Sequence, residues 1–286
     1  MTWITWTALA VGMCLTATFG LAAYGASRWA ASTRDLLGQL EAARQPATVS
    51  RYDARELEGL PAPVQRYFRA VLRDGQPIIT AVTVEHTGSF NISKASEQWK
   101  PFSSRQRVVT RRPGFVWDAR VTIFPGLAVL VHDAYVAGVG ILKPSVMGLH
   151  AMADLHGDGE IARGELMRYF AEAAWYPTAL LPSQGVQWEA VDDCSARASL
   201  VDGAQRVTML IHFDKAGLIA SARFDARGAT VGKDIVQMPW ESRCSNYTER
   251  EGMRVPSTGE AAWLTAQGRK PYWRGTIASA TYEFAV

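Results

Sequence analysis

Alternating apolar and polar residues dominate the chain from residue 78 to residue 284. A period of two is typical of strands that bury one face and expose the other. The clearest example is a predicted hairpin, in which two alternating stretches flank the turn sequence Asp214-Lys215-Ala216-Gly217. The pattern predicts strands over residues 78–92, 115–123, 127–137, 145–154, 186–191, 196–201, 207–213, 218–224, 237–247, 254–263 and 272–284.

Two stretches replace this alternation with apolar residues three and four positions apart, which is typical of amphipathic helices. One covers residues 61–72 and the other covers residues 161–175. The strands are joined by short turns without a repeating strand-helix-strand rhythm, so we expect an α+β fold that is mostly β. Its natural form is a large curved antiparallel sheet or half-barrel, with the second stretch as one central amphipathic helix in the concavity.

The N-terminal segment contains no charged residue between Trp3 and Ser27. About 20 apolar residues are the length that a helix needs to cross a bilayer, and Trp6 and Tyr24 suit the interfacial belts at its two ends. The sequence therefore predicts a single-pass membrane protein with an N-terminal transmembrane helix. A cleaved signal peptide is the alternative, although the segment lacks a basic leading region. We expect a transmembrane anchor over residues 1–27, a juxtamembrane helical linker over residues 28–59 and a β-rich soluble domain over residues 60–286.

The side of the membrane on which the soluble domain lies stays open. Arg28, Arg34 and Arg44 follow the apolar segment, and no basic residue precedes it. The positive-inside rule therefore favours the cytoplasm. A signal-anchor topology would place the domain on the other side.

Composition and charge narrow the classes of partner. The chain is 48% hydrophobic and 20% charged, as expected of a folded globular protein. Its formal charge of +3 comes from 30 basic and 27 acidic residues spread along the chain, so we expect no nucleic-acid partner. Cys14 lies in the apolar segment, which leaves Cys194 and Cys244 as the candidates for a disulfide. That bond would require an oxidising compartment.

The most specific motif lies in and after the central helix. It consists of GELMRY at residues 164–169, AEAAWYPTALLP at residues 171–182 and VQWEA at residues 186–190. This motif resembles the hallmark of a prokaryotic family known only as a domain of unknown function, and the resemblance extends from residue 60 to the final strand. The layout is also similar to the half-barrels of lipoprotein carriers, which implies a curved sheet and a helix that enclose an apolar cavity. The resemblance supplies no reaction.

The polar face of the central helix is the main candidate for chemistry. Glu165, Arg168 and Glu172 are three and four residues apart, so they share one helix face. In an enzyme, either glutamate would act as a general base and Arg168 would bind an anion. In a structural protein, the same residues would form a salt-bridge ladder on the surface. The sequence contains no GxSxG elbow and no phosphate-binding loop that would favour an enzyme.

A weaker motif precedes the helix. Asp154, His156, Asp158 and Glu165 follow the spacing of a calcium-binding loop, with a histidine where an acidic or amide side chain belongs. Imidazole is a poor ligand for a hard cation, and a predicted strand takes the place of the entering helix. We therefore predict neither a metal nor another cofactor.

Three functions agree with these patterns. The first is a membrane-anchored binding module for a lipid or another apolar ligand in a cavity between sheet and helix. The second is a structural or protein-interaction domain with a filled core, and the third is an enzyme that uses the polar helix face. For the first function, the candidate ligand-binding residues are Glu165, Arg168, Tyr169, Phe170, Glu172, Trp175, Tyr176 and Trp188.

Overall fold

The structure is a computed structural model that describes residues 2–93, 96–231 and 234–286. Three α-helices lie within these residues: α1 (Trp3–Ala43), α2 (Ala62–Val71) and α3 (Glu160–Ala171). The strands are β1 (Ile79–Asn91), β2 (Trp99–Val109), β3 (Gly114–Phe124), β4 (Leu127–Val136), β5 (Val139–Val146), β6 (His150–Ala151), β7 (Leu155–Gly157), β8 (Gln187–Asp192), β9 (Ser195–Asp202), β10 (Gln205–Phe213), β11 (Ile219–Val231), β12 (Asp234–Arg250), β13 (Met253–Thr265) and β14 (Gly268–Phe284).

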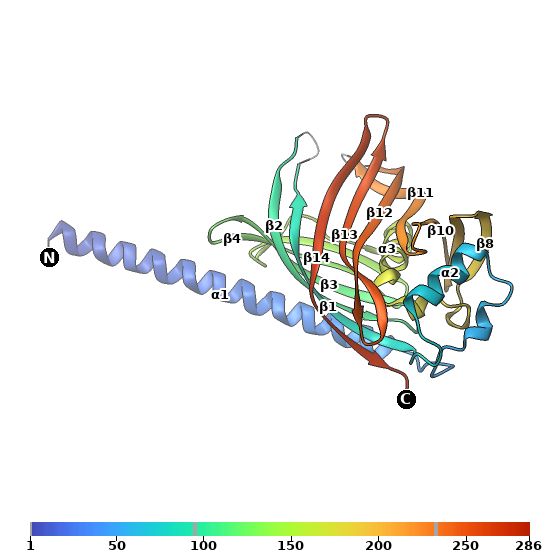
Figure 1. Ribbon diagram of the computed structural model, residues 1–286. Helices are drawn as coiled ribbons and strands as arrows, with labels where there is room; N and C mark the ends of the chain where they lie inside the picture. Colours follow the sequence, from blue (N-terminus) through green and yellow to red (C-terminus); the bar gives the residue numbers. More distant parts are fainter. Residues whose placement is uncertain (1, 94–95, 232–233) are drawn as a thin grey trace.

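All of these strands belong to one antiparallel sheet. Its order is β6-β5-β4-β3-β2-β1-β14-β13-β12-β11-β10-β9-β8, and β7 pairs with β5. Strands β1 to β6 are neighbours in chain order, and so are β8 to β14. The pairing of β1 with β14 joins these two runs into one sheet. The sheet curves around α3, which connects β7 to β8 (Figure 1). The predicted fold, a mostly β half-barrel with one central helix, is confirmed.

The core lies between the concave face of the sheet and the helices that cover it. α2 buries Val64, Tyr67, Phe68 and Val71 against this core, at the three- and four-residue spacing of its apolar positions. The predicted hairpin is also correct: β10 and β11 pair antiparallel, with Ile211 opposite Ala222.

Two parts of the strand assignment were wrong. Strand β2 was not predicted, because its core-facing positions include the polar residues Ser104 and Gln106, which obscure the alternation. It also placed a strand over residues 145–154, whereas β5 ends at Val146 and a turn with Gly148 at positive φ follows.

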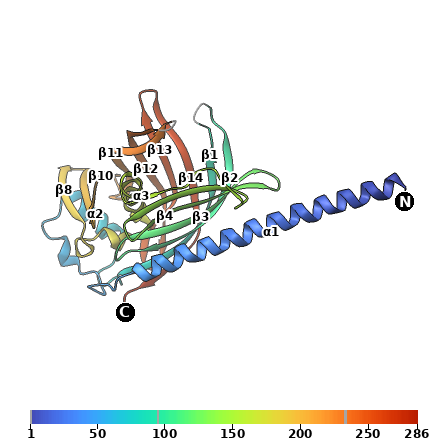
Figure 2. The ribbon, with the colours of Figure 1, turned by 180° about the vertical axis from the view of Figure 1, so that it is seen from behind.

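The helix α1 is about 60 Å long and has two environments. Its N-terminal part projects away from the sheet and is long and apolar enough to be a candidate membrane span or signal sequence (Figure 1). Its C-terminal part packs on the outer face of the sheet, where Leu36 and Leu40 are buried (Figure 2). The Trp29 indole donates a hydrogen bond to Asp118 at 2.9 Å and stacks on His132 at 3.7 Å between ring centroids. The helix and the sheet are therefore joined by specific contacts.

The two candidate disulfide cysteines are far apart. Cys194 is exposed in the turn before β9, and Cys244 lies on β12. Three strand spacings separate β9 from β12 in the sheet, which corresponds to about 14 Å. This separation exceeds the reach of a disulfide.

Candidate functional site

The side chains of Glu165 and Arg168 on α3, and of Glu172 just after it, lie inside the half-barrel. The exposed fractions of the Glu165, Arg168 and Glu172 side chains are 6%, 13% and 14%. The alternative of a salt-bridge ladder on the surface is therefore wrong. The helix is covered by the sheet around most of its circumference, so its polar positions find partners on strands instead of water.

Arg168 is the centre of a buried network, which we call the charge cluster. Its guanidinium donates hydrogen bonds to Glu172 at 2.8 Å and to Asp133 on β4 at 2.5 Å. Gln106 on β2 donates to Glu172 at 2.6 Å and accepts from Arg168 at 3.3 Å. The guanidinium carbon also lies 4.8 Å from the ring centroid of Trp117, a cation–π distance. Buried charges are stable when paired and hydrogen-bonded in this way.

Glu165 forms the other half of the charge cluster. Arg227 on β11 lies 3.8 Å from one carboxyl oxygen of Glu165. Burial raises the pKa of Glu165 well above its usual value, and the neighbouring Asp133 carboxylate raises this pKa further. The other oxygen of Glu165 and the Oδ1 atom of Asp133 have no other partner among the described residues. A protonated Glu165 that donates to Asp133 satisfies both atoms.

This proton also balances the charges of the cluster. Arg168 pairs with both Asp133 and Glu172, whereas Arg227 has Glu165 as its carboxyl neighbour. With Glu165 neutral, the cluster as a whole holds two guanidinium groups and two carboxylates. An ionised Glu165 would leave one excess negative charge in the interior, which is costly.

A second group, the aromatic cluster, lies beside the first. The ring centroid of His86 on β1 is 4.8 Å from that of Trp175 and 5.8 Å from that of Trp273 on β14. Phe102 on β2 contacts Trp117 and Trp273 at centroid distances of 5.9 and 5.7 Å. Burial, together with the charge of Arg168, lowers the pKa of His86 to about 3, so the ring is neutral.

Glycines make room for this cluster. Gly88 and Gly275 face each other across β1 and β14, and the indole of Trp273 lies so close that a Cβ atom on Gly275 would be 2.4 Å from it. A side chain at that position would displace the indole.

Several buried nitrogen atoms in the aromatic cluster have no hydrogen-bond partner among the described residues. The indole nitrogens of Trp117, Trp175 and Trp273 and the Nε2 atom of His86 find no hydrogen-bond partner among the described residues. Most buried polar groups in proteins are satisfied. Four such atoms in one region are therefore a distinctive feature of this part of the core.

The concave face changes from buried to partly exposed along the strands. At one end, core-facing residues such as Val82, Phe115 and Tyr135 are fully buried beneath α3 and the turns that follow it. At the other end the core-facing residues are still apolar but only partly buried. We call this group the open-end lining: Phe90, Ile123, Trp263, Tyr272 and Trp273. Phe90 pairs with Trp273 across β1 and β14, so the lining joins both walls of the half-barrel.

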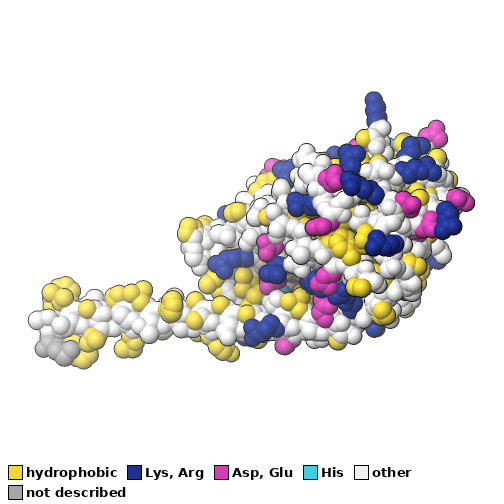
Figure 3. Space-filling model, turned by 60° about the horizontal axis from the view of Figure 1, so that its bottom comes forward, with side chains coloured by type: hydrophobic (Ala, Val, Ile, Leu, Met, Phe, Trp, Pro, Cys, Tyr) yellow, Lys and Arg dark blue, Asp and Glu magenta, His cyan; other side chains and the backbone are white. Residues whose placement is uncertain are grey.

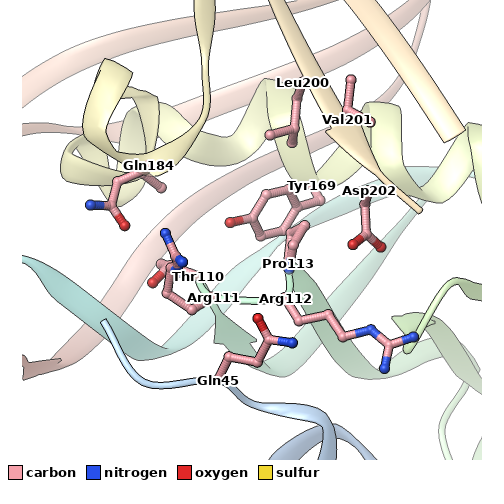
Figure 4. A pocket seen from close by; sticks show the side chains of 11 residues that line it. Gln45, Thr110, Arg111, Arg112, Pro113, Tyr169, Gln184, Leu200, Val201 and Asp202 are labelled. Atoms are coloured by element: carbon pink, nitrogen blue, oxygen red, sulfur yellow. The ribbon is translucent and has the colours of Figure 1, made fainter. Parts of the chain in front are cut away.

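A separate pocket of about 290 Å³ lies at the closed end (Figure 4). Its walls come from the turn between β2 and β3, the end of β9 and the Tyr169 side chain of α3. Arg111, Arg112 and Asp202 all line this pocket (Figure 4), and Asp202 accepts a hydrogen bond from Tyr135 at 2.8 Å. Neither the charge cluster nor the open-end lining contributes to this pocket.

The remaining predicted residues fall in different places. Tyr169, Phe170 and Tyr176 are buried in the core, where the Tyr176 hydroxyl donates to the Tyr169 carbonyl at 2.5 Å. Trp175 belongs to the aromatic cluster. Trp188 lies on β8 and packs edge-on against Phe68 of α2, away from the other candidates.

The loop with calcium-binding spacing does not assemble. Asp154, His156 and Asp158 are exposed, and Asp154 accepts a hydrogen bond from Lys143 at 2.8 Å. Glu165 instead faces the interior. Within the described part of the chain, no group of three acidic, histidine or cysteine side chains could hold a metal ion.

Sequence reasoning missed the strand residues of both clusters. His86, Gln106, Asp133 and Trp273 come from four strands that are distant from α3 in the sequence. The available signal was a polar residue at a core-facing position of an otherwise apolar strand face, which holds for His86, Gln106 and Asp133.

Comparisons with known proteins identify the family. The model of a family of unknown function, DUF6920, matches residues 58–282, and the chain belongs to this family. No curated protein matches. Solved structures similar to this chain include a domain assigned to an outer membrane lipoprotein-sorting protein from Vibrio parahaemolyticus (8% identity, 82% of this chain and 93% of that chain, TM-score 0.37) and a LolA superfamily protein from Nitrosomonas europaea (11% identity, 79% and 94%, TM-score 0.30). Likenesses this distant carry no argument about a ligand.

Proposed function

We propose that this member of the DUF6920 family is a membrane-tethered binding module for a lipid or another apolar molecule. The ligand lies on the concave face of the half-barrel, against the open-end lining. The observation that carries this proposal is that the lining is apolar, continuous with the core, and partly exposed. Partly exposed apolar surface inside a concave fold is typical of binding sites for apolar ligands.

The aromatic cluster supports the same proposal and indicates the chemistry of the ligand. Trp273 belongs to both groups, so a chain that covers the lining would bring its polar end near the unpaired donors of Trp175 and His86. These neutral donors suit acceptor oxygens such as those of an ester, a carboxylate or a phosphate. An amphipathic lipid fits both parts of the site.

The N-terminal helix provides the tether in this proposal. The charge-free part of α1 crosses the bilayer, and the part from Trp29 to Ala43 belongs structurally to the β-rich domain, because it packs on the sheet. In this proposal the helical linker predicted over residues 28–59 is, up to residue 43, the continuation of α1, and it holds the domain close to the membrane.

Lipid extraction combined with native mass spectrometry tests the proposal. The full chain is purified in mild detergent and then exchanged into a volatile buffer with a non-lipid detergent. We expect the chain to retain a bound lipid through this procedure. Phe90→Asp places a charge in the open-end lining and is expected to remove this lipid.

The matched control is Val191→Asp, which changes an exposed apolar residue on β8. It should retain the lipid, and both variants should keep the wild-type circular dichroism spectrum. A folded wild-type chain without lipid, or a folded Phe90→Asp variant with unchanged lipid content, would contradict the proposal and favour a docking domain without a ligand.

A further inference from the structure

The position of α1 on the sheet fixes which end of the domain faces the membrane. Gly25 packs backbone to backbone against the segment after β5: a Cβ atom on Gly25 would lie 2.4 Å from the Met147 carbonyl, and one on Gly148 would lie 2.5 Å from the Gly25 carbonyl. Tyr24, the residue before Gly25, is exposed and belongs to the charge-free part of the helix. Gly25 lies near the C-terminal end of the charge-free segment, which runs from Trp3 to Ser27. The part of the helix before Gly25 therefore projects away from the sheet.

Exposed apolar side chains surround this point. The Met147 amide donates to the Ala128 carbonyl at 3.0 Å, so the turn between β3 and β4 lies beside the segment that holds Gly25. Phe124 and Leu127 on this turn are 61% and 38% exposed, and Met152, just after β6, is 60% exposed. We call Phe124, Leu127 and Met152 the membrane rim. In Figures 1 and 2 the turn between β3 and β4 points toward the side to which α1 projects.

From this arrangement, and on the premise of the proposed membrane tether, we infer that the membrane rim inserts into the surface of the lipid bilayer. The half-barrel then stands with its open end at the membrane and takes its ligand directly from the bilayer. The membrane that covers this apolar surface is thus the membrane that α1 crosses. The packing of Gly25 against Met147 and Gly148 holds the end of the crossing segment beside the membrane rim.

The side chains around the membrane rim suit a lipid surface. The ammonium group of Lys100 lies 5.2 Å from the ring centroid of Phe124, and Arg28 follows the charge-free segment on an exposed face of α1. Long basic side chains beside apolar ones reach toward lipid phosphates while their stems stay in the apolar layer. In Figure 3 apolar side chains cover the projecting helix, and others lie on the end of the domain nearest to it.

The membrane rim is also continuous with the binding site. Ile123 of the open-end lining precedes Phe124 on β3, and Lys100 pairs with Phe90 across β2 and β1. A lipid that leaves the bilayer at the rim would therefore meet the lining without crossing water.

Depth measurements on the full chain in nanodiscs of phosphatidylcholine and phosphatidylglycerol test the inference. Spin labels are attached to single cysteines, in a background with Cys194→Ser and with the labelled position as the only exposed cysteine. The labels sit at Cys14, at Phe124→Cys or Met152→Cys, and at the control Val201→Cys, an exposed apolar position on β9 near the closed end.

Labels at 124 and 152 are expected to be accessible to oxygen. Their protection from a water-soluble nickel complex should be at least threefold greater than that of the label at 201. If the Cys14 label reports the bilayer interior while the rim labels match the label at 201, the inference is overturned and the tether stands. If the Cys14 label reports water, the tether fails, and the inference fails with it.

Discussion

Glu165 is expected to be protonated in the folded protein, and Glu165→Gln tests this directly. A glutamine has the shape of a protonated glutamate and can donate a hydrogen bond to Asp133, as the neutral carboxyl group does. It cannot ionise. If the charge balance of the cluster depends on a neutral side chain at position 165, the variant will keep the fold and will gain stability over the wild type as the pH rises.

The size of the effect follows from proton linkage. Because the pKa of Glu165 is raised in the folded state, its contribution to stability is fully present below the unfolded pKa and is lost as the pH rises toward the folded pKa. The loss is about 1.4 kcal/mol per pH unit for one proton. Over the pH range between the unfolded and the folded pKa of Glu165, the variant should therefore gain stability relative to the wild type as the pH rises, at up to this rate. Groups outside the charge cluster titrate alike in both chains and cancel in the difference.

The assay is urea denaturation of the full chain in detergent, followed by tryptophan fluorescence, at several pH values from 5 to 8. Glu172→Gln is the matched control, because Glu172 pairs directly with Arg168 at 2.8 Å. Removing this buried partner should destabilise the fold by about 3–5 kcal/mol at neutral pH. Parallel curves of stability against pH for Glu165→Gln and the wild type would refute a protonated Glu165.

Two further predictions concern the packing of α1 and the cysteines. Trp29→Ala removes the hydrogen bond to Asp118 and the stacking on His132, so it should lower the free energy of unfolding by about 3–5 kcal/mol. It should also expose the C-terminal half of α1 to limited proteolysis, and an unchanged cleavage pattern would contradict the packing. Exposed Cys194 should react with a water-soluble thiol reagent in the native protein much faster than Cys244, which is partly buried and whose pKa burial raises to about 12; equal rates of native labelling would contradict this difference.

The fold class could be predicted from the sequence, because on most strands and on α2 the apolar residues face the core and the polar residues face solvent. The same rule failed where polar residues are buried. Ser104 and Gln106 hid β2, since alternation cannot distinguish a polar residue facing water from one with a partner in the core. It failed again for α3, where Glu165 faces inward to Arg227 and Asp133, residues that only the folded sheet brings together.

The candidate site shows the same limit. Trp175 and the polar residues of α3 were identifiable from the helix motif, but the residues that complete the site come from β1, β2, β4 and β14. Their proximity depends on the pairing of β1 with β14, which joins the first and last strands of the sheet. No local pattern in the sequence encodes that pairing.

Photocrosslinking from inside the half-barrel tests the central claim most directly. A benzophenone amino acid replaces the aromatic side chain of Phe90 in the full chain, and the same group replaces Val191 on β8 as a control. After irradiation in membranes, the account predicts a lipid adduct on the peptide that contains residue 90 and none on the peptide that contains residue 191. If residue 90 of the folded chain crosslinks only to other residues of the same chain, the result would contradict a lipid site on the concave face.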